Sequence, residues 1–282
     1  MNNDLYICLN GRFVQEQQVL SPDNRAFRYG DGLFETMRLR QGNLLWVHSH
    51  FERLLAGMFT LGIDSSLFNP VEISRQILEL ASLNQISNGR VRVAVFREEG
   101  GNYKPESDRF EYIITISPLP DENYRLNTKG LRLGLYTEIR KPANMLSTLK
   151  SSNALLYVMA SRYARDHSFD EVLILNEQGR ICEASSSNVF LIFPGGRIIS
   201  PASSEGILPG VMRKNIIVRM KEAGFQVEET QVLPEDLYRA EEIFLTNAIQ
   251  GIRWVLSYRE RRYYKNQVQE INNLLLPLQV GS

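Results

Sequence analysis

The sequence is poor in cysteine and histidine. Its 282 residues include two cysteines and three histidines. Two cysteines, Cys8 and Cys182, are too few for the disulfide framework of a small secreted domain. His48 and His50 are separated by one residue, so on a helix they would point to different faces and would not share an ion. We therefore expect neither a disulfide scaffold nor a metal site.

An excess of charge of one sign and long apolar runs are also missing. Lys+Arg and Asp+Glu number 32 each, a formal net charge of +0, so the basic excess that attracts nucleic acid or an anionic membrane is absent. No segment approaches the ~20 apolar residues that cross a bilayer. The N-terminal stretch lacks the basic start and apolar core of a signal peptide. We expect a soluble, cytoplasmic protein whose partners are small molecules or protein chains, with no nucleic acid and no membrane.

What is present is the composition of a globular protein, with 43% hydrophobic and 23% charged residues. Strand-like alternation and helical periodicity occur in both halves, without an internal repeat. Periodicity is lost over residues 117–130, which contain two prolines and end on a glycine. The sequence therefore predicts a mixed α/β (α+β) protein of two domains, a small one over residues 1–120 and a larger one over residues 121–282.

Several elements can be placed from their patterns. Asn10-Gly11 between two apolar runs predicts a hairpin with a type I′ turn. A second helix is predicted over residues 71–83, and strands over residues 90–97 and 110–116. Helical spacing also predicts a first helix that begins near residue 48, with five residues on its buried face: Phe51, Leu54, Leu55, Met58 and Phe59.

Lysine is sparse compared with arginine, which draws attention to Lys150. It follows a loop and immediately precedes an amphipathic segment, where burial and helix N–H groups would lower the pKa of its amine. A neutral amine in that setting can form a Schiff base. The alternative is a solvated loop lysine, which is the commoner case for a residue judged on position alone.

Residues 179–213 combine a carboxylate with a glycine-led helix start. Glu183 follows a strand-like run and precedes a serine turn; it would either pair with the N–H of a heteroaromatic ring or be capped by the turn. Pro209-Gly210 opens a predicted helix whose free N–H groups suit an anion, although it also reads as an ordinary turn. Arg53 would bind a phosphate through two nitrogens, or pair with Glu52 or Asp64.

These hypotheses converge on pyridoxal phosphate, which needs an amine, an acid for its ring nitrogen and a site for its phosphate. Lys150 would hold the aldehyde, and Glu183 would keep the ring nitrogen protonated. Arg53 and the helix start would anchor the phosphate. No single ordinary surface residue meets two of these demands.

The same residues lie in motifs that resemble the class IV aminotransferases, the fold-type IV pyridoxal phosphate enzymes. The signature of that family reads here as EASSSNVF (183–190), IIS (198–200) and LPGVMR (208–213), with Ser200 where threonine is usual. YGDGLFET (29–36), HFERL (50–54) and LKSSN (149–153) also match. The resemblance spans nearly the whole chain.

The resemblance implies a D-amino-acid aminotransferase-like fold, with the cofactor between a small and a large domain, and a homodimer that acts on an amino acid. It also assigns residues. Lys150, in the C-terminal domain, is the Schiff-base lysine and Glu183 is the partner of the ring nitrogen. The remaining cofactor-binding residues are Arg53 and Asn153, with the backbone amides of Val211, Met212 and Ala248.

Within the family, Thr36 in the GDG-x-F-x-T pattern and the segment TNAIQG (246–251) resemble aminodeoxychorismate lyases, in which a hydroxyl at Thr36 would assist proton transfer at the lysine. We therefore expect elimination of pyruvate to give 4-aminobenzoate. Asn102 stands where the lyases usually have an arginine, so a branched-chain or D-amino-acid aminotransferase is the alternative. A non-catalytic pyridoxal phosphate-binding relative is the alternative of another class.

The residues that bind the substrate are left open by these motifs. Phe34 replaces the tyrosine of the D-amino-acid enzymes, and Arg28, Arg97 or Lys104 could supply a positive charge in place of the missing arginine. The candidates are Tyr29, Phe34, Arg97 and Tyr103.

Overall fold

The computed structural model describes residues 5–15, 20–120 and 123–275. The chain forms two compact units. Unit 1 comprises residues Met1–Glu122 together with Lys150–Asn153, and unit 2 comprises Asn123–Leu149 and Ala154–Ser282. Lys150 thus belongs to unit 1, whereas the sequence places it in the C-terminal domain. The domain boundary after residue 120 remains a prediction, because residues 121–122 lie outside the described part.

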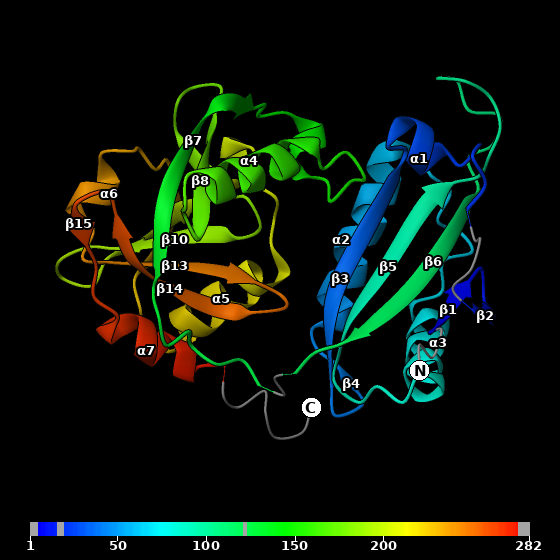
Figure 1. Cartoon of the computed structure of the whole chain (residues 1–282), viewed down its shortest axis with the longest axis horizontal. Coiled ribbons are helices and arrows are strands. Elements are labelled where there is room, and N and C mark those ends of the chain that lie inside the picture. The colour runs from blue at the N-terminus through cyan, green and yellow to red at the C-terminus, as the bar shows by residue number, and fades with distance from the viewer. Residues whose placement is uncertain (1–4, 16–19, 121–122, 276–282) are drawn as a thin grey trace. The chain divides into compact units, whose positions relative to one another are not determined.

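Unit 1 is built on a six-stranded antiparallel sheet, coloured blue to green in Figure 1. The strand order is β2-β1-β6-β5-β3-β4. Asn10 and Gly11 between β1 and β2 have positive φ of 47° and 83°, which confirms the predicted turn. The strands are β1 (Tyr6–Leu9), β2 (Arg12–Gln15), β3 (Gly32–Arg40), β4 (Asn43–Leu44), β5 (Gly89–Arg97) and β6 (Phe110–Pro118).

The described residues of unit 1 form three helices: α1 (Arg25–Tyr29), α2 (Val47–Leu61) and α3 (Pro70–Leu83). Helix α2 packs on β3, and α3 packs on β1 and β6; both lie behind the sheet in Figure 1. Both predicted helices are confirmed. One residue of the predicted buried stripe is wrong, because Phe59 is 86% exposed whereas Phe51, Leu54 and Met58 are buried.

Unit 2 contains a nine-stranded mixed sheet in the order β12-β11-β10-β13-β14-β7-β8-β9, with β15 paired to β14. The pairs β14–β7, β7–β8 and β11–β12 are parallel. The strands are β7 (Leu131–Lys141), β8 (Glu171–Asn176), β9 (Ile181–Ala184), β10 (Asn188–Ile192), β11 (Ile198–Pro201), β12 (Val227–Thr230), β13 (Glu242–Asn247), β14 (Gly251–Tyr258) and β15 (Arg261–Arg262).

The longest helices of unit 2 are α4 (Leu155–Asp166) and α5 (Val211–Glu222). Helix α4 covers β7 and β8, and α5 contacts β12 and β13. The start of α5 after Pro209-Gly210 and the turn between β9 and β10 both agree with the sequence prediction. The remaining helices are α6 (Asp236–Arg239), α7 (Asn266–Asn273) and the 3-10 turns η1 (Met145–Thr148) and η2 (Ser203–Glu205).

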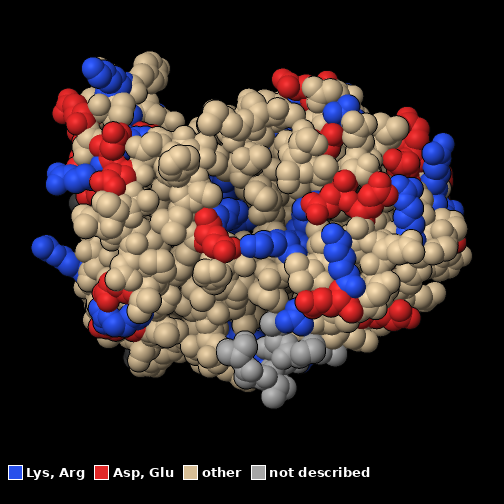
Figure 2. Space-filling model, turned by 180° about the vertical axis from the view of Figure 1, so that it is seen from behind, with Lys and Arg blue, Asp and Glu red and all other residues tan. Residues whose placement is uncertain are grey.

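Charge is mixed over the face of the molecule in Figure 2, where lysines and arginines alternate with aspartates and glutamates. Among the described residues, no helix is long and apolar enough to cross a membrane.

Candidate functional site

Pairing with strand β3 fixes the position of Lys150. The amide of Phe34 donates to the Lys150 carbonyl at 2.9 Å, and the amide of Ser152 donates to the Gly32 carbonyl at 2.9 Å. Ser151 forms an isolated antiparallel bridge with Leu33. Lys150 is therefore held as an extra strand segment, not at a helix start as the sequence suggests. Its Nζ lies 4.5 Å from the centre of the Phe34 ring.

Phe34 also contacts a residue that sequence reasoning missed. The guanidinium carbon of Arg92 in β5 lies 3.6 Å from the centre of the same ring. Arg92 is half-buried, and it makes no ion pair or hydrogen bond with any residue that the structure describes. Burial, followed by the charge of Arg90, lowers its pKa. Arginines in such positions ordinarily pair with an acid, so Arg92 is a candidate cation for an anionic ligand.

Thr36 lies opposite Arg92 in the β3–β5 register. It is 8% exposed, and its hydroxyl has no hydrogen-bond partner within the described part of the chain. Phe34 and Thr36 are two residues apart on β3, so both side chains point to one face of the sheet. This face therefore presents an aromatic ring, a hydroxyl and a guanidinium near Lys150.

Arg53 forms an ion pair with Glu35, a partner that the sequence did not suggest. Its Nε and Nη2 donate to the two carboxylate oxygens of Glu35 at 2.7 and 2.6 Å, and His50 Nδ1 lies 2.7 Å from Glu35 Oε2. Burial raises the pKa of Glu35, but the charge of Arg53 and the hydrogen bonds from His50 and Arg53 outweigh it and bring the pKa to about 2. Burial lowers the pKa of His50. Arg53 is thus oriented by the buried carboxylate of Glu35, which His50 also contacts, and the phosphate contact of Arg53 remains a prediction.

Asn153 and Tyr29 lie beside the turn between α1 and β3. Asn153 Nδ2 donates to the Gly30 carbonyl at 3.2 Å, which ties the Lys150 segment to that turn. The rings of Tyr29 and Tyr103 are 5.5 Å apart, and Tyr103 is 90% exposed. Asn153 therefore acts on the backbone here; its contact with a cofactor and the substrate roles of the tyrosines remain predictions.

Arg97 is surrounded by partners inside unit 1. It is 6% exposed and binds Asp31, Asp108 and the carbonyls of Leu61 and Gly62. A substrate carboxylate would have to displace these contacts. The other expected sources of charge differ, since Arg28 pairs with Asp23 at 3.1 Å and Lys104 is exposed.

Glu183 lies in β9 of unit 2 and is 3% exposed. Its Oε1 accepts hydrogen bonds from Lys141 Nζ at 2.5 Å and Tyr157 Oη at 2.7 Å, and its Oε2 accepts one from the Leu208 amide at 2.8 Å. Burial and the charge of Glu183 raise the pKa of Tyr157, so its phenol stays a donor. Neither alternative drawn from the sequence included Lys141 or the cap by Leu208.

The start of α5 fits an anion. No side chain caps the helix, so the first N–H groups, including those of Val211 and Met212, have no partner within the helix. Asn188 donates to the Leu208 carbonyl at 2.9 Å. A Cβ at Gly210 would lie 1.9 Å from Asn188 Oδ1. The close approach therefore requires glycine and keeps the helix end open.

Other signature residues hold the scaffold. Arg213 donates to the Ser200 hydroxyl at 3.1 Å and to the Pro201 carbonyl, which ties α5 to β11. The hydroxyl that serine shares with threonine is thus used structurally. Ala248 accepts a hydrogen bond on its carbonyl from Tyr124 at 2.7 Å, which fixes the turn where its amide lies.

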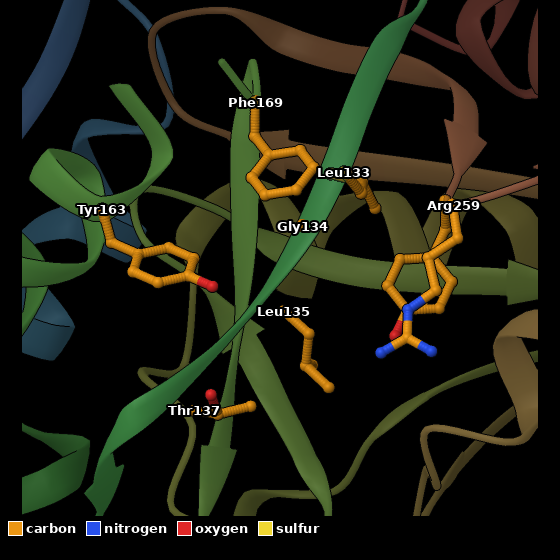
Figure 3. A pocket seen from close by; sticks show the side chains of 8 residues that line it. Leu133, Gly134, Leu135, Thr137, Tyr163, Phe169 and Arg259 are labelled. Carbon is orange, nitrogen blue, oxygen red and sulfur yellow. The ribbon is translucent and has the colours of Figure 1, made fainter. Parts of the chain in front are cut away.

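A separate pocket of about 170 Å³ lies in unit 2 around β7. In Figure 3, Tyr163 and Arg259 lie on opposite sides of this strand, and Phe169 and Leu135 also contribute. None of the residues that the sequence motifs assign to the cofactor lines it. No group of three or more histidine, cysteine or acidic residues in the described ranges could hold a metal ion.

Comparisons with known proteins concern the family and the fold. The family model for amino-transferase class IV matches residues 32–258. A Methanocaldococcus jannaschii protein provisionally named branched-chain-amino-acid aminotransferase is 30% identical over 95% of this chain and 93% of its own. The aminodeoxychorismate lyase of Bacillus subtilis is 31% identical over 86% of this chain and 83% of its own. A branched-chain aminotransferase structure from Thermoproteus uzoniensis has a TM-score of 0.87 at 23% identity, covering 95% of this chain and 92% of that one, and shows the shared fold.

Proposed function

Because the chain belongs to the class IV aminotransferase family, we propose that it is a pyridoxal phosphate enzyme that eliminates pyruvate from an amino acid of the aminodeoxychorismate type, giving 4-aminobenzoate. One observation carries this choice of reaction. Thr36 places an unpartnered, buried hydroxyl on the face of β3 that also carries Phe34, whose ring lies beside the Lys150 amine. Elimination needs a proton to be moved near that amine, and a hydroxyl can hold it.

The residues present fit the cofactor. An uncapped α5 beside Gly210 suits the phosphate, and the buried carboxylate of Glu183 suits a protonated ring nitrogen. Lys150 suits the aldehyde, because strand pairing fixes its backbone. When bound, pyridoxal phosphate supplies the sink for the electron pair released at the substrate α-carbon.

Each residue then has a role of its own. Lys150 binds the cofactor covalently and, once freed, moves the α-proton as base and acid. Glu183 holds the ring N–H. Arg53, pre-oriented by Glu35, and the N–H groups of Val211 and Met212 bind the phosphate, with the Ala248 amide as a further donor.

We also propose that Arg92 binds a substrate carboxylate, since its guanidinium has no acid partner in the described ranges. Arg92 would thereby take the role of the arginine that lyases usually have at the position of Asn102. The same cation would also suit a dicarboxylic keto acid, which favours transamination as the second candidate. A homodimer remains part of the proposal by analogy with the family.

The decisive assay compares two products. The purified protein with pyridoxal phosphate is given aminodeoxychorismate, and pyruvate release is followed; in parallel, amine exchange is followed with branched-chain and D-amino acids plus a keto acid. Pyruvate without a keto acid supports the lyase, and exchange alone would remove it in favour of the transaminase.

The visible absorption spectrum tests the alternative that the protein is a non-catalytic relative. We expect a visible absorption band of lysine-bound cofactor that Lys150→Ala abolishes and that Lys129→Met, at an exposed lysine, leaves intact. A wild-type protein that stays colourless with added cofactor would support a scaffold instead.

A further inference from the structure

Lys141 is a buried lysine that lies outside the family motifs described above. It is the last residue of β7, and its side chain and that of Glu183 in β9 are each 4% exposed. The Nζ–Oε1 distance of 2.5 Å makes this a buried ion pair. Burying a lysine is unfavourable unless an anionic partner lies close to it. The ion pair therefore fixes the position of the Glu183 carboxylate.

The donors divide unequally between the two oxygens of Glu183. Oε1 accepts from both Lys141 and Tyr157, whereas among the described residues Oε2 accepts from the Leu208 amide alone. A carboxylate oxygen accepts about two hydrogen bonds. Oε1 is therefore filled, and Oε2 keeps one position open.

We propose that Lys141 is a positioning residue for Glu183: it leaves Oε2 as the oxygen that meets the cofactor's ring nitrogen, and its charge lowers the proton affinity of that nitrogen. The inference rests on the proposed function, because it assumes that Glu183 meets the ring of pyridoxal phosphate.

The sign follows from the charges. The lysine and the glutamate sum to zero, so a proton on the ring nitrogen adds an uncompensated positive charge to a buried cluster. Without Lys141, the same proton would neutralise Glu183 instead. Lys141 thus weakens the electron sink while it holds the acid in place.

Three other titratable groups surround Glu183. Tyr157 from α4 stays neutral, since burial raises its pKa. Burial also raises the pKa of Cys182, its neighbour on β9, to about 12, so this thiol stays neutral. Arg213 from α5 is a second cation, but it pairs with Glu229. Lys141 is therefore the charge whose removal should matter.

The test uses the full-length protein loaded with pyridoxal phosphate carrying ¹⁵N in the ring, and follows the ¹⁵N chemical shift against pH. Lys141→Met removes the charge, and Lys141→Gln removes it while keeping a hydrogen-bond donor and polarity that favour folding. In both variants we expect the ring nitrogen to lose its proton about one pH unit or more above the wild-type midpoint.

Three matched variants separate charge from structure. Lys141→Arg keeps the charge and should titrate as the wild type does. Tyr157→Phe removes a neutral donor to the same oxygen and should move the midpoint far less. Lys129→Met removes an exposed lysine of the same unit and should move nothing.

The inference is overturned if both charge-removing variants bind cofactor at Lys150 and show the wild-type ¹⁵N profile, or if Tyr157→Phe shifts it as far as they do. A wild-type protein that never attaches cofactor to Lys150 contradicts the proposed function instead. The two failures are therefore distinguishable.

Discussion

The buried carboxylate of Glu35 should dominate the acid sensitivity of unit 1, and Glu35→Gln tests this. The substitution keeps the size of the side chain but removes the charge that Arg53 and His50 bind. The guanidinium of Arg53 and the ring of His50 would then lose their anionic partner. Removing one member of a buried ion pair costs about 3–5 kcal/mol of folding free energy.

The pKa gives an independent magnitude. The pKa of Glu35 falls from 4.5 to about 2, which corresponds to about 3 kcal/mol of folding stability. Because the folded pKa is the lower one, this stability is complete above the unfolded value of 4.5 and is lost as the pH falls through 2. By pH 3 roughly 2 kcal/mol of it should be gone.

The measurement is urea unfolding of the wild type and Glu35→Gln at pH 7 and at pH 3. We expect a difference of about 3 kcal/mol at pH 7 that shrinks to about 1 kcal/mol at pH 3. His50 is present in both proteins, but the Glu35 carboxylate raises its pKa, so the difference reports on the cluster of Glu35, His50 and Arg53 together.

Glu72→Gln is the matched control. The pKa of Glu72 is also lowered to about 2, chiefly by its hydrogen bond with Arg75, but this pair is exposed. Its loss should change stability little at either pH. A difference for Glu35→Gln that is equally small, or that does not depend on pH, would refute the reasoning.

Three further variants test the site. Glu183→Gln should keep the cofactor but lose most turnover, because the ring N–H loses its anionic partner; near-normal rates in a steady-state assay would contradict this. Arg92→Gln should raise KM for the anionic substrate ~10- to 100-fold. The melting temperature should not fall, since no described residue forms an ion pair with Arg92. The control Arg90→Gln, at an exposed arginine, should change neither KM nor the melting temperature. Gly210→Ala should weaken cofactor binding at least ~10-fold in a fluorescence titration, because Asn188 must move; unchanged affinity would remove the anion site from α5.

Local patterns predicted the elements well, because their causes are local. Asn10-Gly11 supports positive φ wherever it occurs between strands, and Pro209-Gly210 opens a helix for reasons of backbone geometry. Phe59 shows the limit. It satisfies the helical period of α2, yet it is 86% exposed. The width of the buried stripe on a helix depends on how much of the helix surface the packed sheet covers, which the period does not give.

The missed residues depend on contacts between distant segments. Glu35 meets His50 and Arg53 only because α2 packs on β3, and no spacing in the sequence encodes that register. Arg92 alternates with valines as in any half-exposed strand, so only the three-dimensional structure shows that none of the described acidic residues forms an ion pair with it. In the sequence, Lys141 is an ordinary lysine before a proline. Its role depends on Glu183, which lies on a different strand, β9.

Residues of the family signature and residues outside it have different roles in these contacts. Arg213, Ser200 and Asn188 belong to the signature, yet their hydrogen bonds shape the start of α5 and the strands beside it. A scaffold of this kind serves any reaction of the cofactor, which explains why one signature covers lyases and transaminases. The choice between them must then rest on residues that the signature leaves out. Thr36, whose buried hydroxyl has no partner among the described residues, and Arg92, which forms no ion pair with any of them, are two that the structure supplies.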